Sequence, residues 1–220
     1  AGFNAFLGGN ITVSPLTFFY YFSKETPVVL ELSSWQLADL RGRKVLKPFI
    51  SIITKIVPDH QNWYGNMEDY VKDKRLIYAD QVYSEENSCY SIFDFDEDLP
   101  EHVPNKELHS ESSWGQLFAN ESKACVLRYS KTGLNDGAFG VWLEENKDSK
   151  AFGKVFLQGM KEPEVILNGL SVPGEHMKAN VLNAALTLFL MGVEPAKIVE
   201  ICKSWPGIDH RLQYFHTWHF

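Results

Sequence analysis

Three chemically useful side chains stand beyond separate apolar stretches of this sequence. Glu31 follows the β-prone run 27–30, and His60 follows a second apolar run, 49–57. Lys74 comes next, on a segment with helical periodicity. Because parallel strands carry polar groups to one edge of a sheet, we expect the three side chains to meet there. Carboxylate oxygens with a nearby imidazole suit Mg²⁺ or Mn²⁺.

Lys74 lies on the apolar side of the predicted helix 67–82. At helical spacing it shares a face with Tyr70, Val71, Ile77 and Tyr78. In one interpretation its stem packs while the ammonium reaches water. In the other, partial burial lowers its pKa, and the free amine acts as a base, binds phosphate or becomes carbamylated, which would turn a cation into a metal ligand.

Each candidate also has a purely structural interpretation. Glu31 would stabilise a helix dipole, Ser33 and Ser34 would cap a helix, and His60 would pair with Asp59 in a loop. Each structural interpretation alone is the more common case. It is less common for three such residues, a carboxylate and an imidazole at strand ends and a lysine on the apolar face of a helix, to converge by chance. We therefore keep the metal-site hypothesis alongside the structural interpretations.

Composition sets the class of protein. The 220 residues are 45% hydrophobic and 22% charged, with a net charge of −7 and no basic block, which argues against a nucleic-acid partner. The chain has no apolar run of membrane-spanning length and no signal-peptide pattern, so we expect no membrane association. Its three cysteines, Cys89, Cys125 and Cys202, lack metal spacing and indicate reduced thiols in a cytoplasmic protein.

The order of elements predicts an α/β fold. Predicted strands at 28–32, 49–54 and 88–93 alternate with helices, which favours a three-layer arrangement with a mostly parallel sheet and flanking helices. The acidic segment 94–122 is expected to be mostly loop. Four short β-type runs then predict a small antiparallel subsheet, and two helices close the chain; these elements are 125–129, 139–143, 154–157, 165–167, 175–191 and 195–205.

Five motifs occur in the order found in Mur ligases, and together they cover nearly the whole chain. They are Gly8-Gly9-Asn10, the stretch 31–37, Asp59-His60 with 64–70 and Lys74, 173–176 with Asn180, and 207–211. The chain therefore resembles that family. The Ser-Ser-aromatic-Gln form at 33–36 is similar to the form in its D-glutamate-adding members.

The resemblance implies a cytoplasmic, ADP-forming ligase of peptidoglycan precursor synthesis. Such a ligase uses ATP and Mg²⁺, with two metal sites, to join D-glutamate to UDP-N-acetylmuramoyl-L-alanine. The substrate carboxylate takes the ATP γ-phosphate to form an acyl phosphate, which the amine of D-glutamate attacks. It further implies a monomer whose central ATPase-type domain spans 1–211, with 212–220 beginning the C-terminal domain or its linker.

The resemblance implies a role for each residue that matches a functional position of the family. Glu31 and His60 resemble Mg²⁺-site residues, and Lys74 resembles the family's carbamylated lysine, which helps to hold the second metal. These three form the expected catalytic set. Asn180 and Arg211 are similar to ATP-contacting residues, Arg211 at the phosphates. The residues similar to those that bind the UDP-muramoyl substrate are Asn10, Ser33, Ser34 and Gln36.

The chain also departs from the family pattern. It contains no GxxxxGK[ST] phosphate loop, so we expect a fragment that is inactive by itself. Met177 and Gln213 stand where Asn and Glu are usual, and Asn62-Trp63 replaces the more usual Asp-Arg. Two alternatives stay open: a sister ligase that adds another amino acid or acts on folate, and a non-catalytic UDP-sugar-binding module.

Overall fold

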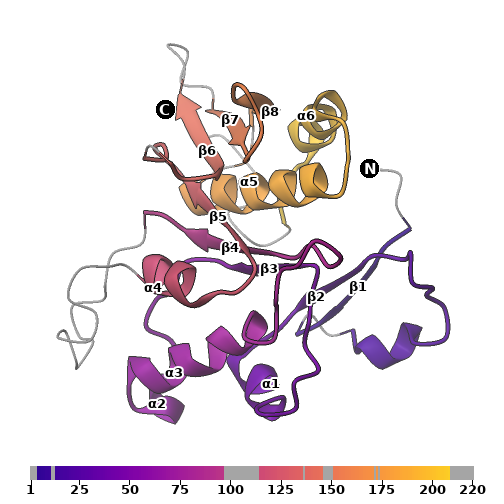
Figure 1. Cartoon of the computed structure of the whole chain (residues 1–220), viewed down its shortest axis with the longest axis vertical. Helices are drawn as coiled ribbons and strands as arrows, with labels where there is room; N and C mark the ends of the chain where they lie inside the picture. Colours follow the sequence, from indigo (N-terminus) through magenta and orange to yellow (C-terminus); the bar gives the residue numbers. More distant parts are fainter. Residues whose placement is uncertain are drawn as a thin grey trace, which may run out of the picture.

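A six-stranded sheet forms the middle layer of the molecule (Figure 1). The computed structural model describes residues 4–10, 13–96, 114–135, 137–145, 151–170, 172 and 174–208. The sheet order is β3-β4-β5-β6-β7-β8. Its strands are β3 (Ile50–Ile53), β4 (Tyr90–Asp94), β5 (Cys125–Ser130), β6 (Gly140–Glu145), β7 (Ala151–Phe156) and β8 (Glu164–Asn168).

The sheet is parallel at one end and antiparallel at the other. β3 to β6 pair in parallel, and β6, β7 and β8 pair antiparallel. The predicted mostly parallel sheet with a small antiparallel part is therefore confirmed. The run 125–129 was wrongly assigned to the antiparallel part, because β5 is a parallel strand between β4 and β6.

Helices cover both faces of this sheet, which confirms the three-layer prediction. Adjacent residues of β4 point to opposite faces: Ile92 packs with α5 (Glu175–Leu190) and α6 (Pro195–Ser204). Phe93 packs with α3 (Met67–Lys74) and α4 (Trp114–Glu121). Both side chains are fully buried, as expected for a parallel strand covered on its two faces.

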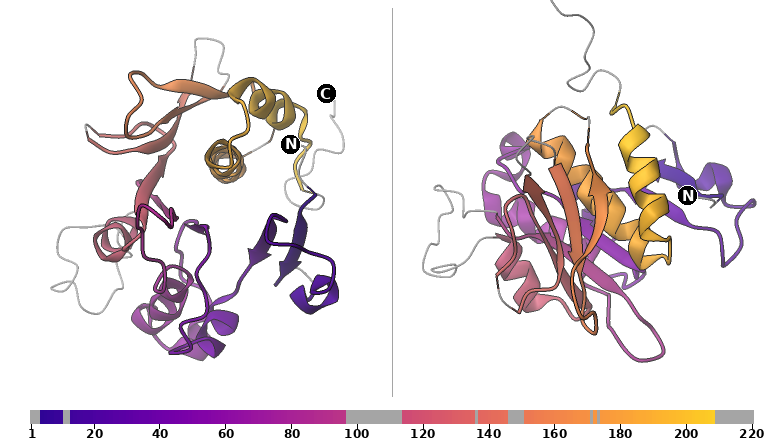
Figure 2. Two further views of the ribbon diagram at one scale, coloured as in Figure 1. Left: turned by 45° about the vertical axis from the view of Figure 1, so that its right-hand side comes forward. Right: turned by 90° about the horizontal axis from the view of Figure 1, so that it is seen from above.

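A separate two-stranded parallel sheet carries the first candidate residue. β1 (Phe6–Gly9) pairs with β2 (Val28–Glu31), and the pair stands apart from the larger sheet (Figure 2). A strand at 6–9 was not predicted, because its two glycines lower β-propensity. The apolar sequence of β2 predicts a buried strand, but the side chains of Val28, Val29 and Leu30 are 38%, 53% and 36% exposed. Among the described residues β2 pairs only with β1. The described strands therefore form two separate sheets and not one continuous parallel sheet.

Two helix predictions need correction. The helix predicted over 67–82 ends at Lys74 and continues only as the 3₁₀ turn η2 (Arg75–Ile77). The segment 94–122, predicted as loop, contains α4, whose Trp114 and Phe118 are buried against β4. Tertiary burial of these two rings stabilises a helix in a locally polar segment. No helix in the described part of the chain is long and apolar enough to cross a bilayer.

Candidate active site at the end of β2 and the start of α2

Asn10 and Glu31 are brought together by the parallel pairing of β1 and β2. Gly9 stands opposite Glu31 in the ladder, so both strands end at the same level. The Asn10 amide N–H donates to the Glu31 carbonyl at 2.7 Å, and its side-chain Nδ2 donates to Glu31 Oε1 at 3.4 Å. Both residues are exposed, so the Glu31 carboxylate is accessible to a ligand.

Substitution of Gly9 should displace this carboxylate. Gly9 has φ +101°, and an added Cβ would lie 2.1 Å from the Glu31 carbonyl oxygen. We expect Gly9→Ala to break the ladder there and to destabilise the protein by about 1–3 kcal/mol. Urea unfolding measures this. Gly42→Ala is the control, because Gly42 also has positive φ but no atom within 4 Å of an added Cβ. Equal losses in the two variants would contradict the close-approach argument.

Ser33 and Gln36 form a capping box at the start of α1 (Ser34–Asp39). The Ser33 hydroxyl accepts from the Gln36 amide at 3.3 Å, and the Gln36 Oε1 accepts from the Ser33 amide at 2.9 Å. The structural interpretation of Ser33 as an N-cap is confirmed. Ser34 is buried beside the Tyr64 phenol. The substrate-binding roles of Ser33, Ser34 and Gln36 remain predictions.

His60 is held in a left-handed backbone conformation at the start of α2 (Gln61–Tyr64). Its φ is 54°, which costs a residue with a Cβ about 1–2 kcal/mol. Asp59 stabilises the conformation: its Oδ1 accepts from the His60 amide at 2.8 Å, and its Oδ2 lies 3.4 Å from Nε2. The predicted Asp59 pairing is thus confirmed. Such strain is typical of functional positions.

Lys74 lies partly buried at the end of α3 with its ammonium 5.6 Å from the centre of the Tyr70 ring. Burial lowers the pKa of Lys74, while the negative charges of Asp59 and Glu31 act in the opposite direction. Burial likewise raises the pKa of Tyr70 to about 12, so this phenol stays neutral. Two carboxylates from segments distant in sequence, Glu31 and Asp59, therefore act on one amine.

Sequence reasoning used Asp59 only as a partner of His60 and did not assign Tyr70 to the site. Two signals were available. Asp59 directly precedes His60, and Tyr70 stands four residues before Lys74, the spacing that places side chains together on a helix.

The donor set suits a hard cation only when Lys74 contributes. No group of three His, Cys, Asp or Glu side chains among the described residues is arranged to hold a metal ion. Glu31 and His60 offer one oxygen ligand group and one nitrogen, whereas Mg²⁺ requires mostly oxygen. A carbamate on Lys74 would add the missing oxygens, so the residues fit Mg²⁺ on that condition.

The nucleotide-contact candidates lie on and beyond α5. Asn180 is exposed on the second turn of this helix. Arg211 lies outside the described residues, as do Gln213 and the segment 212–220. Met177 is 2% exposed and belongs to the core cluster formed by β4 to β8 with α5 and α6, so its side chain packs inside the domain.

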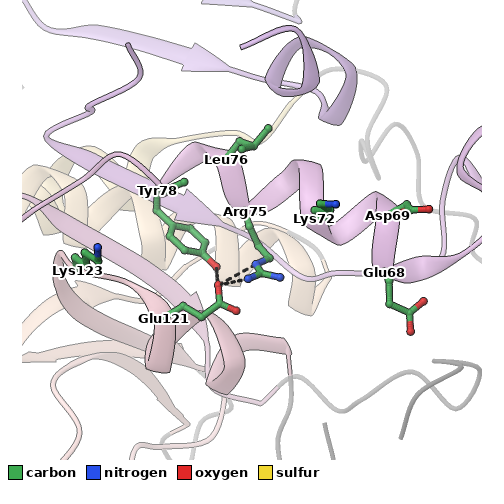
Figure 3. A pocket seen from close by; sticks show the side chains of 9 residues that line it. Glu68, Asp69, Lys72, Arg75, Leu76, Tyr78, Glu121 and Lys123 are labelled. Carbon is green, nitrogen blue, oxygen red and sulfur yellow. Dashed lines mark hydrogen bonds and ion pairs between the residues drawn. The ribbon is translucent and has the colours of Figure 1, made fainter. Parts of the chain in front are cut away.

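A groove of about 600 Å³ between α3, η2 and α4 contains none of the predicted site residues (Figure 3). Glu121 accepts from the Tyr78 hydroxyl at 3.0 Å and from Arg75 Nε at 2.9 Å. Burial, reinforced by the Glu121 charge, raises the pKa of Tyr78. These contacts tie η2 and the following Tyr78 to the end of α4, so they have a structural role beside the groove.

Loss of that tie should cost measurable stability. We expect Glu121→Ala to lower the free energy of unfolding by about 1–3 kcal/mol, because the buried Tyr78 hydroxyl loses its acceptor. Chemical denaturation measures the change. The matched variant Glu200→Ala breaks an ion pair whose carboxylate side chain is 69% exposed, and we expect it to cost under about 0.5 kcal/mol. If both variants were equally stable, the tie would be unimportant.

Comparison with known families decides the class of the protein. A family model described as the Mur ligase middle domain matches residues 10–188. The chain belongs to the Mur ligase family. This result confirms the predicted resemblance. The candidate residues from Asn10 to Asn180 lie within the matched segment, and Arg211 lies beyond it.

Several Mur ligase relatives carry the name UDP-N-acetylmuramoylalanine--D-glutamate ligase. One from Treponema pallidum is 34% identical over 286 residues, covering 98% of this chain and 48% of the relative. One from Borreliella afzelii is 30% identical over 215 residues, covering 94% of this chain and 39% of the relative. The chain thus spans less than half the length of these relatives.

A solved Mur ligase has the same fold. The structure of UDP-N-acetylmuramoyl-L-alanyl-D-glutamate--2,6-diaminopimelate ligase superposes with a TM-score of 0.54 at 17% identity, covering 87% of this chain and 35% of that chain. At this identity the likeness supports the three-layer fold and leaves the amino-acid substrate open.

Proposed function

We propose that this chain is the central domain of a ligase that joins D-glutamate to UDP-N-acetylmuramoyl-L-alanine with ATP. The single observation that carries the proposal is the amine of Lys74, which is partly buried and in the field of Asp59, just before α2, and of Glu31, at the end of β2. The proposal is further supported by relatives named as D-glutamate ligases over nearly the whole chain. We assign 1–211 to this domain and 212–220 to the C-terminal domain or its linker.

Lys74 has the properties that carbamylation requires. Only an unprotonated amine attacks CO₂: the nitrogen forms a bond to carbon and releases one proton, leaving an anionic carbamate. Burial lowers the pKa of Lys74 and so enlarges the reactive fraction at neutral pH. The field of Asp59 and Glu31 favours the ammonium and opposes the anion, so a bound cation would shift the balance toward the carbamate.

The remaining residues position the reacting groups. Glu31 and His60, with carbamylated Lys74, would hold Mg²⁺, at two sites in the intact enzyme. When bound, this cation neutralises the charge shared by the substrate carboxylate and the ATP γ-phosphate. Asn10 orients Glu31, and Asp59 orients His60. Asn180 and Arg211 would contact ATP, and Ser33, Ser34 and Gln36 would face the UDP-muramoyl substrate. We propose that the enzyme acts as a cytoplasmic monomer.

An amino-acid panel tests the proposed substrate. We expect phosphate release by the full-length enzyme to require ATP, Mg²⁺, UDP-N-acetylmuramoyl-L-alanine and D-glutamate together. L-Glutamate, L-lysine and diaminopimelate are the comparison amino acids. Turnover with one of these in place of D-glutamate would assign the chain to a sister ligase. Substrate binding without any turnover would indicate a non-catalytic module.

The 220-residue chain alone should be inactive. It contains no GxxxxGK[ST] loop to hold the phosphates of ATP. We expect no substrate-dependent phosphate release above the level of a Lys74→Ala variant of the same chain, measured with a coupled phosphate assay. Release that depends on both substrates would show that other residues of the chain hold the nucleotide.

A further inference from the structure

A buried carboxylate, that of Asp73, joins three helices that adjoin the candidate site. The Asp73 side chain is 4% exposed, and its Oδ1 accepts from Arg41 Nη2 at 2.6 Å and from Nε at 3.2 Å. Its Oδ2 accepts from the Tyr64 hydroxyl at 3.0 Å. Arg41 lies just after α1, and Tyr64 is the last residue of α2. Asp73 itself lies in α3, directly before Lys74. One side chain therefore connects α1, α2 and α3.

Each of the three helices adjoins one candidate residue. α1 begins at Ser34, shortly after Glu31, and α2 begins directly after His60. Lys74 is the last residue of α3. Helices of six and four residues, such as α1 and α2, are too short to be stable by themselves. Their positions depend on tertiary contacts, and both pack against α3 (Figure 1).

Ring contacts link these helices to the candidate residues. Trp35 of α1 packs on His60, with ring centres 4.4 Å apart. The ring centre of Tyr70 lies 5.5 Å from that of Tyr64 and 6.3 Å from that of His60. The Lys74 ammonium is 5.6 Å from the centre of the same Tyr70 ring. A shift of α1 or α2 relative to α3 would therefore change the position of the imidazole relative to the amine.

We propose that Asp73 is a positioning residue of the ligase, which holds the candidate metal ligands Glu31 and His60 in register with the end of α3. This inference rests on the proposed function. Both carboxylate oxygens of Asp73 are engaged by protein donors, Oδ1 by Arg41 and Oδ2 by the Tyr64 hydroxyl. Asp73 thus acts through the positions of the helices and not as a ligand.

Metal binding by the full-length enzyme tests this role. The probe is Mn²⁺ with bicarbonate present, and electron paramagnetic resonance measures the free ion. We expect Asp73→Ala to weaken Mn²⁺ binding about tenfold and to lower kcat at least about tenfold, the scale for residues that orient metal ligands. The KM for D-glutamate should change less than about twofold, because Asp73 is not proposed to contact that substrate.

Tyr64→Phe removes one contact and leaves the carboxylate paired with Arg41. It keeps the aromatic ring and should weaken Mn²⁺ binding about three- to tenfold, the effect of one hydrogen bond. If Asp73 acts through Tyr64, the two losses are not additive. The double variant Asp73→Ala/Tyr64→Phe should then bind Mn²⁺ as Asp73→Ala does.

Ser91→Ala is the control for a loss of stability alone. Ser91 is fully buried near the start of β4, where its hydroxyl takes part in hydrogen bonds with Ser51, Gln81 and Ser122. Its replacement should lower the urea midpoint, because buried polar groups lose a partner. Mn²⁺ binding and kcat should be unchanged at a temperature at which circular dichroism shows the variant to be folded.

Each outcome has one interpretation. Weaker Mn²⁺ binding in Asp73→Ala, but not in Ser91→Ala, supports positioning. Destabilisation of Asp73→Ala with unchanged Mn²⁺ binding and kcat overturns it, as do additive losses in the double variant. If Asp73→Ala does not fold, Tyr64→Phe decides, and unchanged Mn²⁺ affinity in that variant overturns the inference. An unsubstituted enzyme that neither binds Mn²⁺ nor releases phosphate with D-glutamate contradicts the proposed function itself.

Discussion

Lys74→Ala should lower kcat of the full-length ligase by at least about 100-fold, the scale of losing a group that holds a catalytic cation. Glu31 and Asp59 both act electrostatically on Lys74, and burial lowers its pKa. Alanine removes the amine that would carry the carbamate. Added bicarbonate should therefore not restore turnover, which a phosphate-release assay measures.

Lys72→Ala is the matched control for this prediction. Lys72 lies on the same helix but is exposed, and we expect turnover to change less than about twofold. A ¹³C-bicarbonate NMR experiment adds a second readout: a carbamate resonance should be present in the unsubstituted protein and in Lys72→Ala, and absent in Lys74→Ala. Near-normal kcat in Lys74→Ala would remove the carbamate from the mechanism.

Phe93→Ala should destabilise the domain by about 3–5 kcal/mol. Phe93 is fully buried on β4, and its ring centre lies 5.1 Å from that of Tyr78 and 5.6 Å from that of Phe118. The cavity would open between the sheet and the helices α3 and α4, where rigid packing prevents collapse. Equilibrium unfolding in urea measures the loss.

Phe49→Ala is the matched control for the core prediction. Phe49 precedes β3, is 48% exposed and packs edge-on against Tyr90 with ring centres 5.6 Å apart. We expect it to cost under about 1.5 kcal/mol, because much of the ring already contacts water. Similar losses from Phe49→Ala and Phe93→Ala would show that the two layers are not packed as described.

Much of the secondary structure was readable from local pattern. The strands β2, β3 and β4 and the helices α5 and α6 lie within a few residues of their predicted positions, because continuous apolar runs and a Pro at the start of α6 mark them. The strand β1 and the helix α4 were missed. Glycines hide the first, and the second is stabilised by packing of Trp114 and Phe118 rather than by its own composition.

Some features of the candidate site could likewise be predicted from the sequence, and others could not. Motif order pointed to Glu31, His60 and Lys74, and helical spacing placed Lys74 on the buried side of its helix. The capping role of Ser33, the left-handed backbone at His60 and the flanking Trp35 ring required coordinates. Each depends on a neighbour that spacing does not specify.

The sequence by itself was enough to predict the candidate residues, the alternation of strands and helices, and the resemblance to Mur ligases. Only the tertiary structure decided that Asp59 and Glu31 act on one partly buried amine, and that β2 pairs with β1 apart from the larger sheet. The physical reason is the separation along the chain over which each effect acts. Propensity and periodicity act over a few residues, whereas burial, strand pairing and the field at Lys74 arise between segments that are distant along the chain.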